Sequence, residues 1–327
     1  MKPYVFIDRP VPAQVEQHIA EHCEYSVWDR RESIPADVLR EKLAKADGLL
    51  TAGRKIDSRL LELAPNLKAV STISVGYNHF DVAAMKARGV LGTNTPDVLT
   101  DTVADLVFGL ILSTARRIPE LDRYVKDGLW KRDDGENLFG VDVHHASLGI
   151  VGMGRIGEAV ARRGKFGFSM SVGYCNRTRR EAAERELGAV YMSMEELLRS
   201  SDFVVLMTPL TPETTRMFGR EQFAMMKRGA IFINASRGQT VDEAALASAL
   251  QEGTIYAAGL DVFEREPVAA DNPLLGMPNV VTLPHIGSAT ARTRFDMAML
   301  AARNLVLAVS GQTPPNLVPE LRANGQG

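Results

Sequence analysis

Two side chains at the ends of predicted strands have the chemistry to bind a small anion and move a proton. Arg237 follows the apolar segment 230–234, and His285 follows the segment 280–283. A planar guanidinium can bind a carboxylate and a carbonyl oxygen together, which a lysine ammonium reproduces poorly. An imidazole titrates near neutrality, so it can donate a proton in one reaction direction and accept it in the other. A surface arginine and a structural histidine are the plainer alternatives.

A carboxylate close to the histidine would complete a proton-transfer pair. Glu264 and Glu266 both lie in the segment Phe-Glu-Arg-Glu-Pro, and either could accept a hydrogen bond from the second ring nitrogen of His285. Such a contact fixes the tautomer and stabilises the protonated ring. The sequence alone does not decide between the two glutamates. His144 and His145, with only Asp142 nearby, are interpreted as structural or surface residues.

A glycine motif predicts a nucleotide phosphate site. Gly152, Gly154 and Gly157 follow the apolar segment 148–151, precede an amphipathic stretch at 158–166, and are followed by a second strand at 171–174. In this context the first glycine permits a tight turn, the second lets a pyrophosphate approach, and the third lets the helix pack closely on the strand. A purely structural glycine turn is the alternative, and the strand–turn–helix context argues against it.

The residues after the second strand favour NADP(H) over NAD(H). An NAD site usually has an acidic residue here, which binds the ribose hydroxyls. This chain instead has Asn176, Arg177 and Thr178, followed by Arg179 and Arg180. Arginine binds a 2′-phosphate through charge-assisted hydrogen bonds. A solvated, basic start to the next helix is the alternative explanation, mainly for the last two arginines.

Strands and helices alternate along the chain in two series, which predicts two α/β domains with parallel sheets. The first series has strands near 4–7, 25–28, 48–52, 67–73 and 90–93, separated by helices near 13–21, 36–44, 58–64 and 81–88. A long helix at 102–116 leads to the second series, with strands near 148–151, 171–174, 203–207, 230–234, 256–260 and 280–283, and a last helix at 291–310. Cap-type residues place the boundaries near Asp101 and Ser288. We therefore expect residues 1–101 and 289–327 to form one discontinuous domain, and residues 102–288 to form the dinucleotide-binding domain.

Composition narrows the class of protein. The chain has 327 residues, of which 45% are hydrophobic, and a net charge of −2, so no global field favours nucleic acid or an anionic membrane. The longest apolar stretch, 106–115, is too short to span a bilayer, and the charged N-terminus is unlike a signal peptide. The two cysteines, Cys23 and Cys175, have no metal-like spacing. We expect a cytoplasmic protein without a metal.

Taken together, the motifs resemble the D-isomer-specific 2-hydroxyacid dehydrogenase family. The resemblance rests on the glycine motif, Asn234-Ala-Ser-Arg-Gly238, Gly259-Leu-Asp-Val-Phe-Glu-Arg-Glu-Pro267 and Pro284-His-Ile-Gly-Ser-Ala289, whose order and spacing match across nearly the whole chain. The segments Ser71–Tyr77 and Asp142–His145, with the arginines after the second strand, look most like the bacterial glyoxylate/hydroxypyruvate and 2-ketogluconate reductase branch.

The resemblance implies a Rossmann cofactor domain inserted into a flavodoxin-like substrate domain. It also implies NADPH-dependent reduction of a small 2-keto acid (glyoxylate, hydroxypyruvate or 2-ketogluconate) to the D-2-hydroxy acid by a homodimer, with NADH as a possible second donor. Arg237, Glu266 and His285 would be catalytic, which selects Glu266 over Glu264, and Ser74, Val75 and Gly76 would bind the substrate with Arg237 and His285. Besides the glycines and 176–178, the implied cofactor contacts are Arg155, Ile156, Thr208, Pro209, Thr214, Ala235, Asp261, His285 and Gly287.

Two alternatives stay open. A non-catalytic nucleotide-sensing regulator exists on the same fold, and other members of the family oxidise different 2-hydroxy acids. For Asp261 the alternative is a turn cap, for Thr214 a helix cap, and for Gly76 a turn glycine. Trp130 and Phe139 lie in the segment 127–145, which packs on a second subunit in the family and would be ordinary packing in a monomer.

Overall fold

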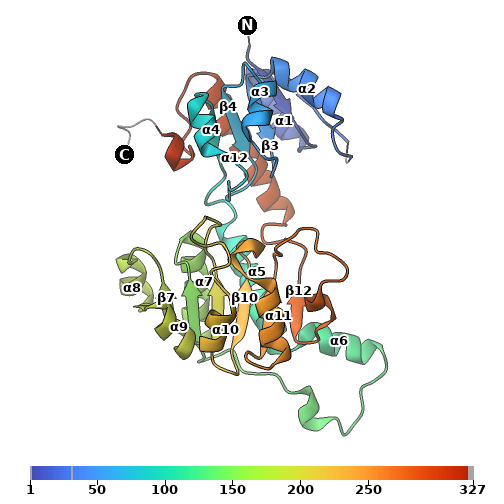
Figure 1. The fold of residues 1–327 in the computed structure, drawn as a ribbon, viewed down its shortest axis with the longest axis vertical. Coiled ribbons are helices and arrows are strands. Elements are labelled where there is room, and N and C mark those ends of the chain that lie inside the picture. Colours follow the sequence, from blue (N-terminus) through green and yellow to red (C-terminus); the bar gives the residue numbers. More distant parts are fainter. Residues whose placement is uncertain (1, 31, 323–327) are drawn as a thin grey trace. The chain divides into compact units, whose positions relative to one another are not determined.

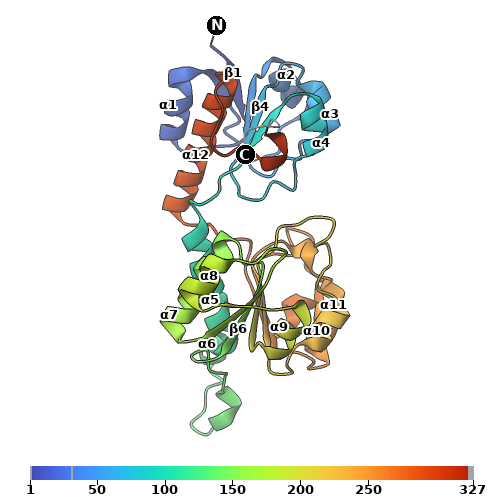
Figure 2. The same ribbon diagram turned by 90° about the vertical axis from the view of Figure 1, so that its left-hand side faces the viewer.

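The computed structural model describes residues 2–30 and 32–322. The chain divides into two compact units, one made of the segment up to Leu99 together with the segment from Thr290, and the other of Thr100–Ala289. Each unit is built on one parallel sheet, of five strands in the first and seven in the second (Figures 1 and 2). The predicted fold class, two doubly wound α/β domains, is confirmed.

The first unit has the strand order β2-β1-β3-β4-β5, which is the flavodoxin-like order. Its strands are β1 (Tyr4–Ile7), β2 (Glu24–Val27), β3 (Gly48–Thr51), β4 (Ala69–Thr72) and β5 (Leu91–Thr93). Helices α1 (Ala13–His22) and α12 (Ala291–Val309) cover one face, and α2 (Ala36–Lys45), α3 (Ser58–Leu63) and α4 (Val82–Ala87) cover the other (Figure 2). Because both faces are covered, the central strands β3 and β4 are buried throughout.

The second unit has the order β12-β11-β10-β9-β6-β7-β8. All its strands are parallel, and the strands that follow β6 in the sequence are added on one side of it up to β8 and on its other side from β9 onward. This is the dinucleotide-binding order, and ligands of such sheets bind at the carboxyl ends of the strands beside this reversal of order. The strands are β6 (Ser147–Val151), β7 (Ser171–Cys175), β8 (Val190–Tyr191), β9 (Phe203–Leu206), β10 (Ile231–Asn234), β11 (Ala257–Leu260) and β12 (Val280–Thr282).

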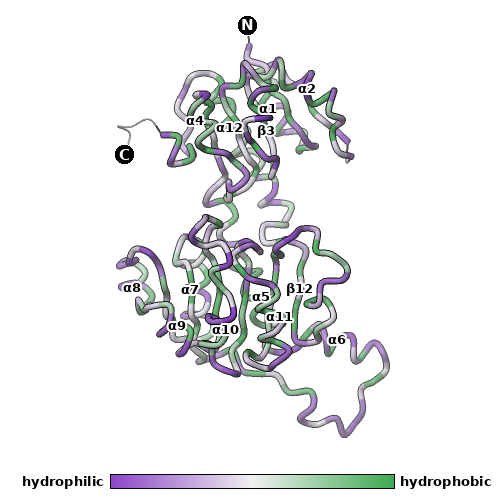
Figure 3. The backbone as a smooth tube through the Cα atoms, in the orientation of Figure 1, coloured by the Kyte–Doolittle hydropathy of each residue, from purple (hydrophilic) through white to green (hydrophobic). Residues whose placement is uncertain are grey.

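Helices on both faces of this sheet bury its apolar strands. One face carries α5 (Thr100–Ala115), α7 (Arg155–Phe168) and α8 (Glu181–Leu187), and the other carries α9 (Met194–Ser200), α10 (Arg220–Met225) and α11 (Glu243–Gln251) (Figure 2). In Figure 3 the central strands are coloured as hydrophobic and the outer helix α8 mainly as hydrophilic. Helix α6 (Ile118–Lys126) and a following 3₁₀ turn at Gly135–Leu138 project away from the unit (Figures 1 and 2).

Two local features differ from the sequence expectation. Helix α7 begins at Arg155, three residues earlier than the predicted stretch, because the extended backbone of Gly154 serves as its N-cap. Strand β8 was not predicted, since it has only two residues and both are exposed at the sheet edge. Within the described residues, no helix is long and apolar enough to cross a bilayer.

Candidate active site

Each of the three glycines of the predicted phosphate site is needed for a different structural reason. Gly152 has a φ of +105°, and a Cβ there would lie 2.8 Å from the carbonyl carbon of Met207. A Cβ at Gly157 would lie 2.5 Å from the carbonyl oxygen of Gly152, so helix and strand can pack this closely only without a side chain. At Gly154 a Cβ would meet nothing within 4 Å. The space at the N-terminus of α7 is therefore open, as a bound pyrophosphate requires.

The three arginines after β7 differ in whether a carboxylate pairs with them. The Nη2 of Arg179 lies 2.6 Å from Oε2 of Glu184, and the Nη2 of Arg180 lies 2.7 Å from Oε1 of Glu158. Arg177 forms no hydrogen bond or ion pair in the part of the chain that the structure describes. Among these three described arginines, Arg177 is therefore the one without a carboxylate at ion-pair distance, and only the charge of Glu213 acts on it electrostatically.

Several other predicted cofactor residues make local contacts that shape their own loops. The amide of Asn176 donates to the carbonyl of Thr178 at 3.1 Å, and the hydroxyl of Thr214 donates to the carbonyl of Pro209 at 2.6 Å. The bond of Thr214 closes a turn, and no helix begins there, so the structure does not show the helix cap that was the alternative for this residue. Arg155 and Ile156 begin α7. Ala235 directly follows β10, Thr208 and Pro209 lie in the segment after β9, and Gly287 lies five residues after the end of β12.

The structure brings His285 and Glu266 together. The Nδ1 of His285 lies 2.7 Å from Oε2 of Glu266, and the other carboxylate oxygen accepts a hydrogen bond of 3.1 Å from the N–H of Phe263. Glu264 points elsewhere, and its Oε1 lies 2.7 Å from Nη2 of Arg216. Because Nδ1 is occupied by Glu266, Nε2 is the ring nitrogen left to face a substrate.

The electrostatics of this pair favour an ionised glutamate. Partial burial tends to raise the pKa of Glu266, but hydrogen bonds from His285 and the Phe263 N–H, with the charge of Arg237, lower the pKa overall. Glu266 is therefore a carboxylate at neutral pH and stabilises the protonated imidazole. Burial lowers the pKa of Arg237, an effect that Glu266 opposes. A guanidinium keeps its charge throughout the neutral range.

Arg237 is held against the same segment by a very close backbone approach. A Cβ on Gly238 would lie 1.8 Å from the carbonyl carbon of Phe263, so only glycine allows these two loops to touch. The amide of Asn234 donates to the carbonyl of Arg237 at 3.2 Å, and the guanidinium donates to the carbonyl of Ser236 at 2.6 Å. The sequence shows that Gly238 follows Arg237, but it does not show this contact with Phe263.

Asp261 fixes the backbone around His285. Its buried carboxylate accepts hydrogen bonds from the N–H of Ile286 at 2.7 Å and of Gly287 at 2.8 Å, and its carbonyl accepts one from His285 at 2.9 Å. Burial raises the pKa of Asp261, and these N–H groups oppose that effect. His285 itself has a φ of +53°, a conformation that non-glycine residues adopt only when their surroundings impose it. Asp261 therefore caps the distant turn at 286–287 rather than the turn that follows it in the sequence, and this geometry makes it a positioning residue for His285.

A cavity of roughly 440 Å³ in the second unit opens onto this pair. His285 and Glu266 supply its proton-transfer groups, and the other lining residues are mostly apolar, namely Phe263, Pro267, Val268, Leu275, Thr282, Leu283 and Pro284. A few polar groups in a mainly apolar pocket are typical of small-molecule sites.

In the first unit, the predicted substrate loop presents unused N–H groups after β4. The carbonyls of Ser74, Val75 and Gly76 accept hydrogen bonds from the Thr95 N–H (2.9 Å), the Asn94 amide (2.8 Å) and the Ser74 hydroxyl (2.8 Å). The N–H groups of Val75 and Gly76 have no acceptor among the described residues. A rigid loop with its carbonyls occupied and its N–H groups available is suited to an anion.

Comparison with known proteins agrees with this geometry. Residues 108–287 match the family described as D-isomer specific 2-hydroxyacid dehydrogenase, NAD binding domain. The glyoxylate/hydroxypyruvate reductase B of Yersinia pestis is 51% identical over 318 residues, covering 97% of this chain and 98% of that protein.

Solved structures are similar over the whole chain. The TT0316 protein of Thermus thermophilus has a TM-score of 0.89 and 42% identity, covering 96% of this chain and 99% of that one. An NADPH-dependent glyoxylate/hydroxypyruvate reductase from Sinorhizobium meliloti, in complex with NADP and malonate, has a TM-score of 0.87 and 34% identity, with full coverage of both chains.

Proposed function

The chain belongs to the D-isomer-specific 2-hydroxyacid dehydrogenase family, and we propose that it reduces glyoxylate and hydroxypyruvate with NADPH. The observation that carries the proposal is the 2.7 Å contact between His285 and Glu266, beside an arginine at the carboxyl edge of a dinucleotide-binding sheet. The names of the relatives support these two substrates, and 2-ketogluconate is a third candidate of the same chemical class. NADH is a possible but less favoured donor.

In the proposed mechanism each residue has one task. Arg237 binds the substrate carboxylate and orients the keto carbonyl. A nicotinamide cofactor held by the glycine turn and Arg177 would supply the hydride that the carbonyl carbon accepts. His285 donates the proton from Nε2 to the carbonyl oxygen, so that one hydride and one proton convert the keto group to a hydroxyl. Glu266 stabilises the imidazolium before the transfer.

We also assign substrate binding to Ser74, Val75 and Gly76 and cofactor binding to Arg177. The N–H groups of Val75 and Gly76 would bind the substrate carboxylate, while the Ser74 hydroxyl keeps the loop rigid through Gly76. Arg177 would bind the 2′-phosphate, since Arg179 and Arg180 are paired with glutamates.

We further propose a cytoplasmic homodimer. Helix α6 and the segment after it expose large apolar side chains, with exposed fractions of 51% for Ile118, 53% for Val125, 67% for Trp130 and 66% for Phe139. Exposed apolar residues grouped on one projecting segment indicate a protein interface. Both cysteines are free, which fits a reducing compartment.

The test is a substrate panel. Loss of NADPH absorbance is measured with glyoxylate, hydroxypyruvate and 2-ketogluconate, and kcat/KM is compared for NADPH and NADH. We expect turnover with the first two acids and a higher kcat/KM for NADPH. Tight NADPH binding without consumption of any acid would instead support the regulator alternative. Turnover that favours NADH would refute the cofactor assignment alone.

A further inference from the structure

Helix α1, in the first unit, carries a group of residues with metal-binding chemistry that is separate from the His285–Glu266 pair. His18, Glu21 and His22 are spaced i, i+3 and i+4, so they share one face of the helix. The expectation of a protein without a metal rests on the spacing of its cysteines, which gives no information on histidine and glutamate side chains that share a helix face.

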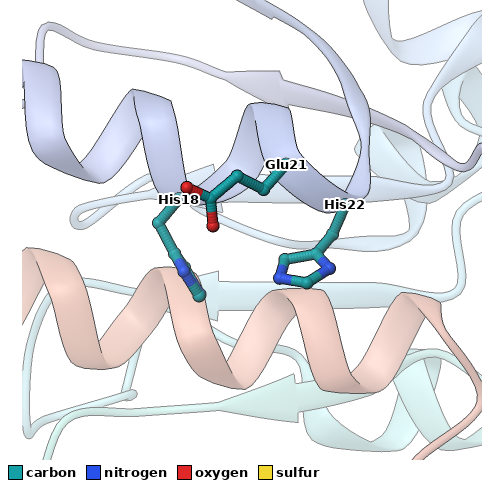
Figure 4. Close-up of side chains that lie close together, drawn as sticks. All are labelled: His18, Glu21 and His22. Carbon is teal, nitrogen blue, oxygen red and sulfur yellow. The ribbon is translucent and has the colours of Figure 1, made fainter.

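The three side chains converge in the structure. One ligand atom from each residue lies within 4.8 Å of the other two, and the ring centroids of His18 and His22 are 5.5 Å apart. Figure 4 shows both imidazoles pointing toward α12, with the Glu21 carboxylate beside His18. Ligand atoms around a tetrahedral zinc with bonds of about 2.0–2.1 Å lie about 3.3 Å apart. Because Glu21 and His22 are exposed and His18 is half-buried, side-chain rotation alone could close the remaining gap.

The donor set selects a class of metal. Two imidazole nitrogens and one carboxylate oxygen suit zinc and its transition-metal neighbours, whereas Ca²⁺ and Mg²⁺ prefer oxygen ligands. Three protein ligands leave a coordination position for water.

Charges around the cluster act in both directions. The cluster lies in the last turns of α1, where the carbonyl ends of the helix favour cations. The ammonium of Lys2 already donates hydrogen bonds to the carbonyls of Ala20 at 3.2 Å and Glu21 at 3.1 Å. Arg303 on α12 acts electrostatically on His18 and opposes a second cation. The neighbouring cations Lys2 and Arg303 are therefore expected to weaken the binding of a metal ion.

We propose that His18, Glu21 and His22 bind one divalent transition-metal ion of the zinc class. Helix α1 runs from the carboxyl end of β1 to the start of β2. Its last turn therefore lies at the amino ends of the strands, whereas the loop at Ser74–Gly76 follows the carboxyl end of β4. The ion stabilises the first unit by binding only its folded state.

The experiment uses full-length, tag-free protein freed of metal with a chelator and then titrated with ZnCl₂ by calorimetry. We expect one Zn²⁺ per chain and a rise in melting temperature. The double variant His18→Ala/His22→Ala is expected to weaken zinc binding at least tenfold and to lose the rise in melting temperature. Glu21→Gln is expected to weaken binding less, since both nitrogen ligands remain. Circular dichroism of the metal-free variants checks that they fold.

A matched control tests the other histidine pair. His144 and His145 have Nδ1 atoms 2.9 Å apart, with Asp142 3.6 Å from His144, so they could also attract zinc. The variant His144→Ala/His145→Ala is expected to bind zinc as wild type does. Binding that survives in His18→Ala/His22→Ala, disappears in the control, or is absent from wild type would overturn the proposal.

Discussion

His285 is the residue whose loss should separate chemistry from cofactor binding. General acid catalysis contributes about 10²–10⁴-fold, so His285→Ala is expected to lower kcat by at least about 100-fold. NADPH affinity, measured by fluorescence titration, should change little, because the proposed phosphate contacts lie at the glycine turn and Arg177. His144→Ala serves as the control for a histidine outside the site. A loss smaller than tenfold would refute the role of His285 as the acid.

Glu266 should control the pH range of reduction. Its pKa is lowered, so it stays ionised through the neutral range and stabilises the protonated imidazole. Glu266→Gln removes this charge and should move the alkaline limb of the kcat/KM profile for reduction to lower pH. Glu264→Gln is the matched control, because Glu264 pairs with Arg216 instead. If the Glu264 variant moved that limb and the Glu266 variant did not, the two roles would be exchanged.

Arg177 should determine the preference for NADPH. Hydrogen bonds to charged groups contribute about 1.5–3 kcal/mol, so Arg177→Ala is expected to raise KM for NADPH by around tenfold or more and to leave KM for NADH nearly unchanged. Arg179→Ala, which removes the partner of Glu184, should affect KM for NADPH less. Equal effects of the two variants would show that the phosphate does not distinguish these arginines.

Residue types predict the kind of chemistry here better than they predict the partners. Arg237 and His285 stand out because of what a guanidinium and an imidazole can do at strand ends. The pairing of Arg180 with Glu158 could not be predicted, because these residues are 22 positions apart and Glu158 belongs to another helix. The same holds for Asp261, whose role depends on the path of the backbone at Ile286 and Gly287.

At the scale of elements, the turn between β6 and α7 contains one glycine that we expect to serve cofactor binding, Gly154, and one that serves packing, Gly157. Gly154→Ala should cost less than about 1 kcal/mol of stability, since its Cβ would enter open space and alanine is only a poorer N-cap. It should nevertheless weaken NADPH binding, because the Cβ occupies the phosphate position. Gly157→Ala should cost about 1–3 kcal/mol through overpacking against Gly152. Urea unfolding and NADPH titration of both variants measure the two effects.

An identical loss of stability in both variants would contradict this division. It would mean that Gly154 and Gly157 contribute equally to folding and that Gly154 is not reserved for the cofactor.

The predicted elements follow from apolar strands alternating with helices, and their ends follow less well. The strands at 203–206 and 231–234 are buried on both faces, so their apolar runs were visible in the sequence. Strand β8 could not be found in this way, since Val190 and Tyr191 are exposed. The start of α7 depends on the backbone of Gly154, which hydrophobic periodicity does not report.

At the scale of the whole molecule, alternation predicts parallel sheets but does not give the strand order. Nothing in the run of strands β6 to β12 states that β9 lies beside β6 rather than beside β8. That position follows from covering both faces of the sheet with helices while keeping every crossover right-handed. Because β6 and β9 are neighbouring parallel strands, the glycine turn after β6 and the residues after β9 lie side by side at the carboxyl ends of the strands.

The oligomeric state is the prediction that belongs to the whole molecule. Light scattering coupled to size-exclusion chromatography is expected to give twice the chain mass of 35.8 kDa for wild type. Trp130→Glu/Phe139→Glu places two charges on side chains that are 67% and 66% exposed in the single chain, so it should leave the fold intact and give a monomer. Val190→Glu, a change at the 53% exposed edge of the larger sheet, should remain dimeric. A dimeric double variant with a wild-type circular dichroism spectrum would exclude the segment after α6 as the interface, and a monomeric wild type would exclude the homodimer itself.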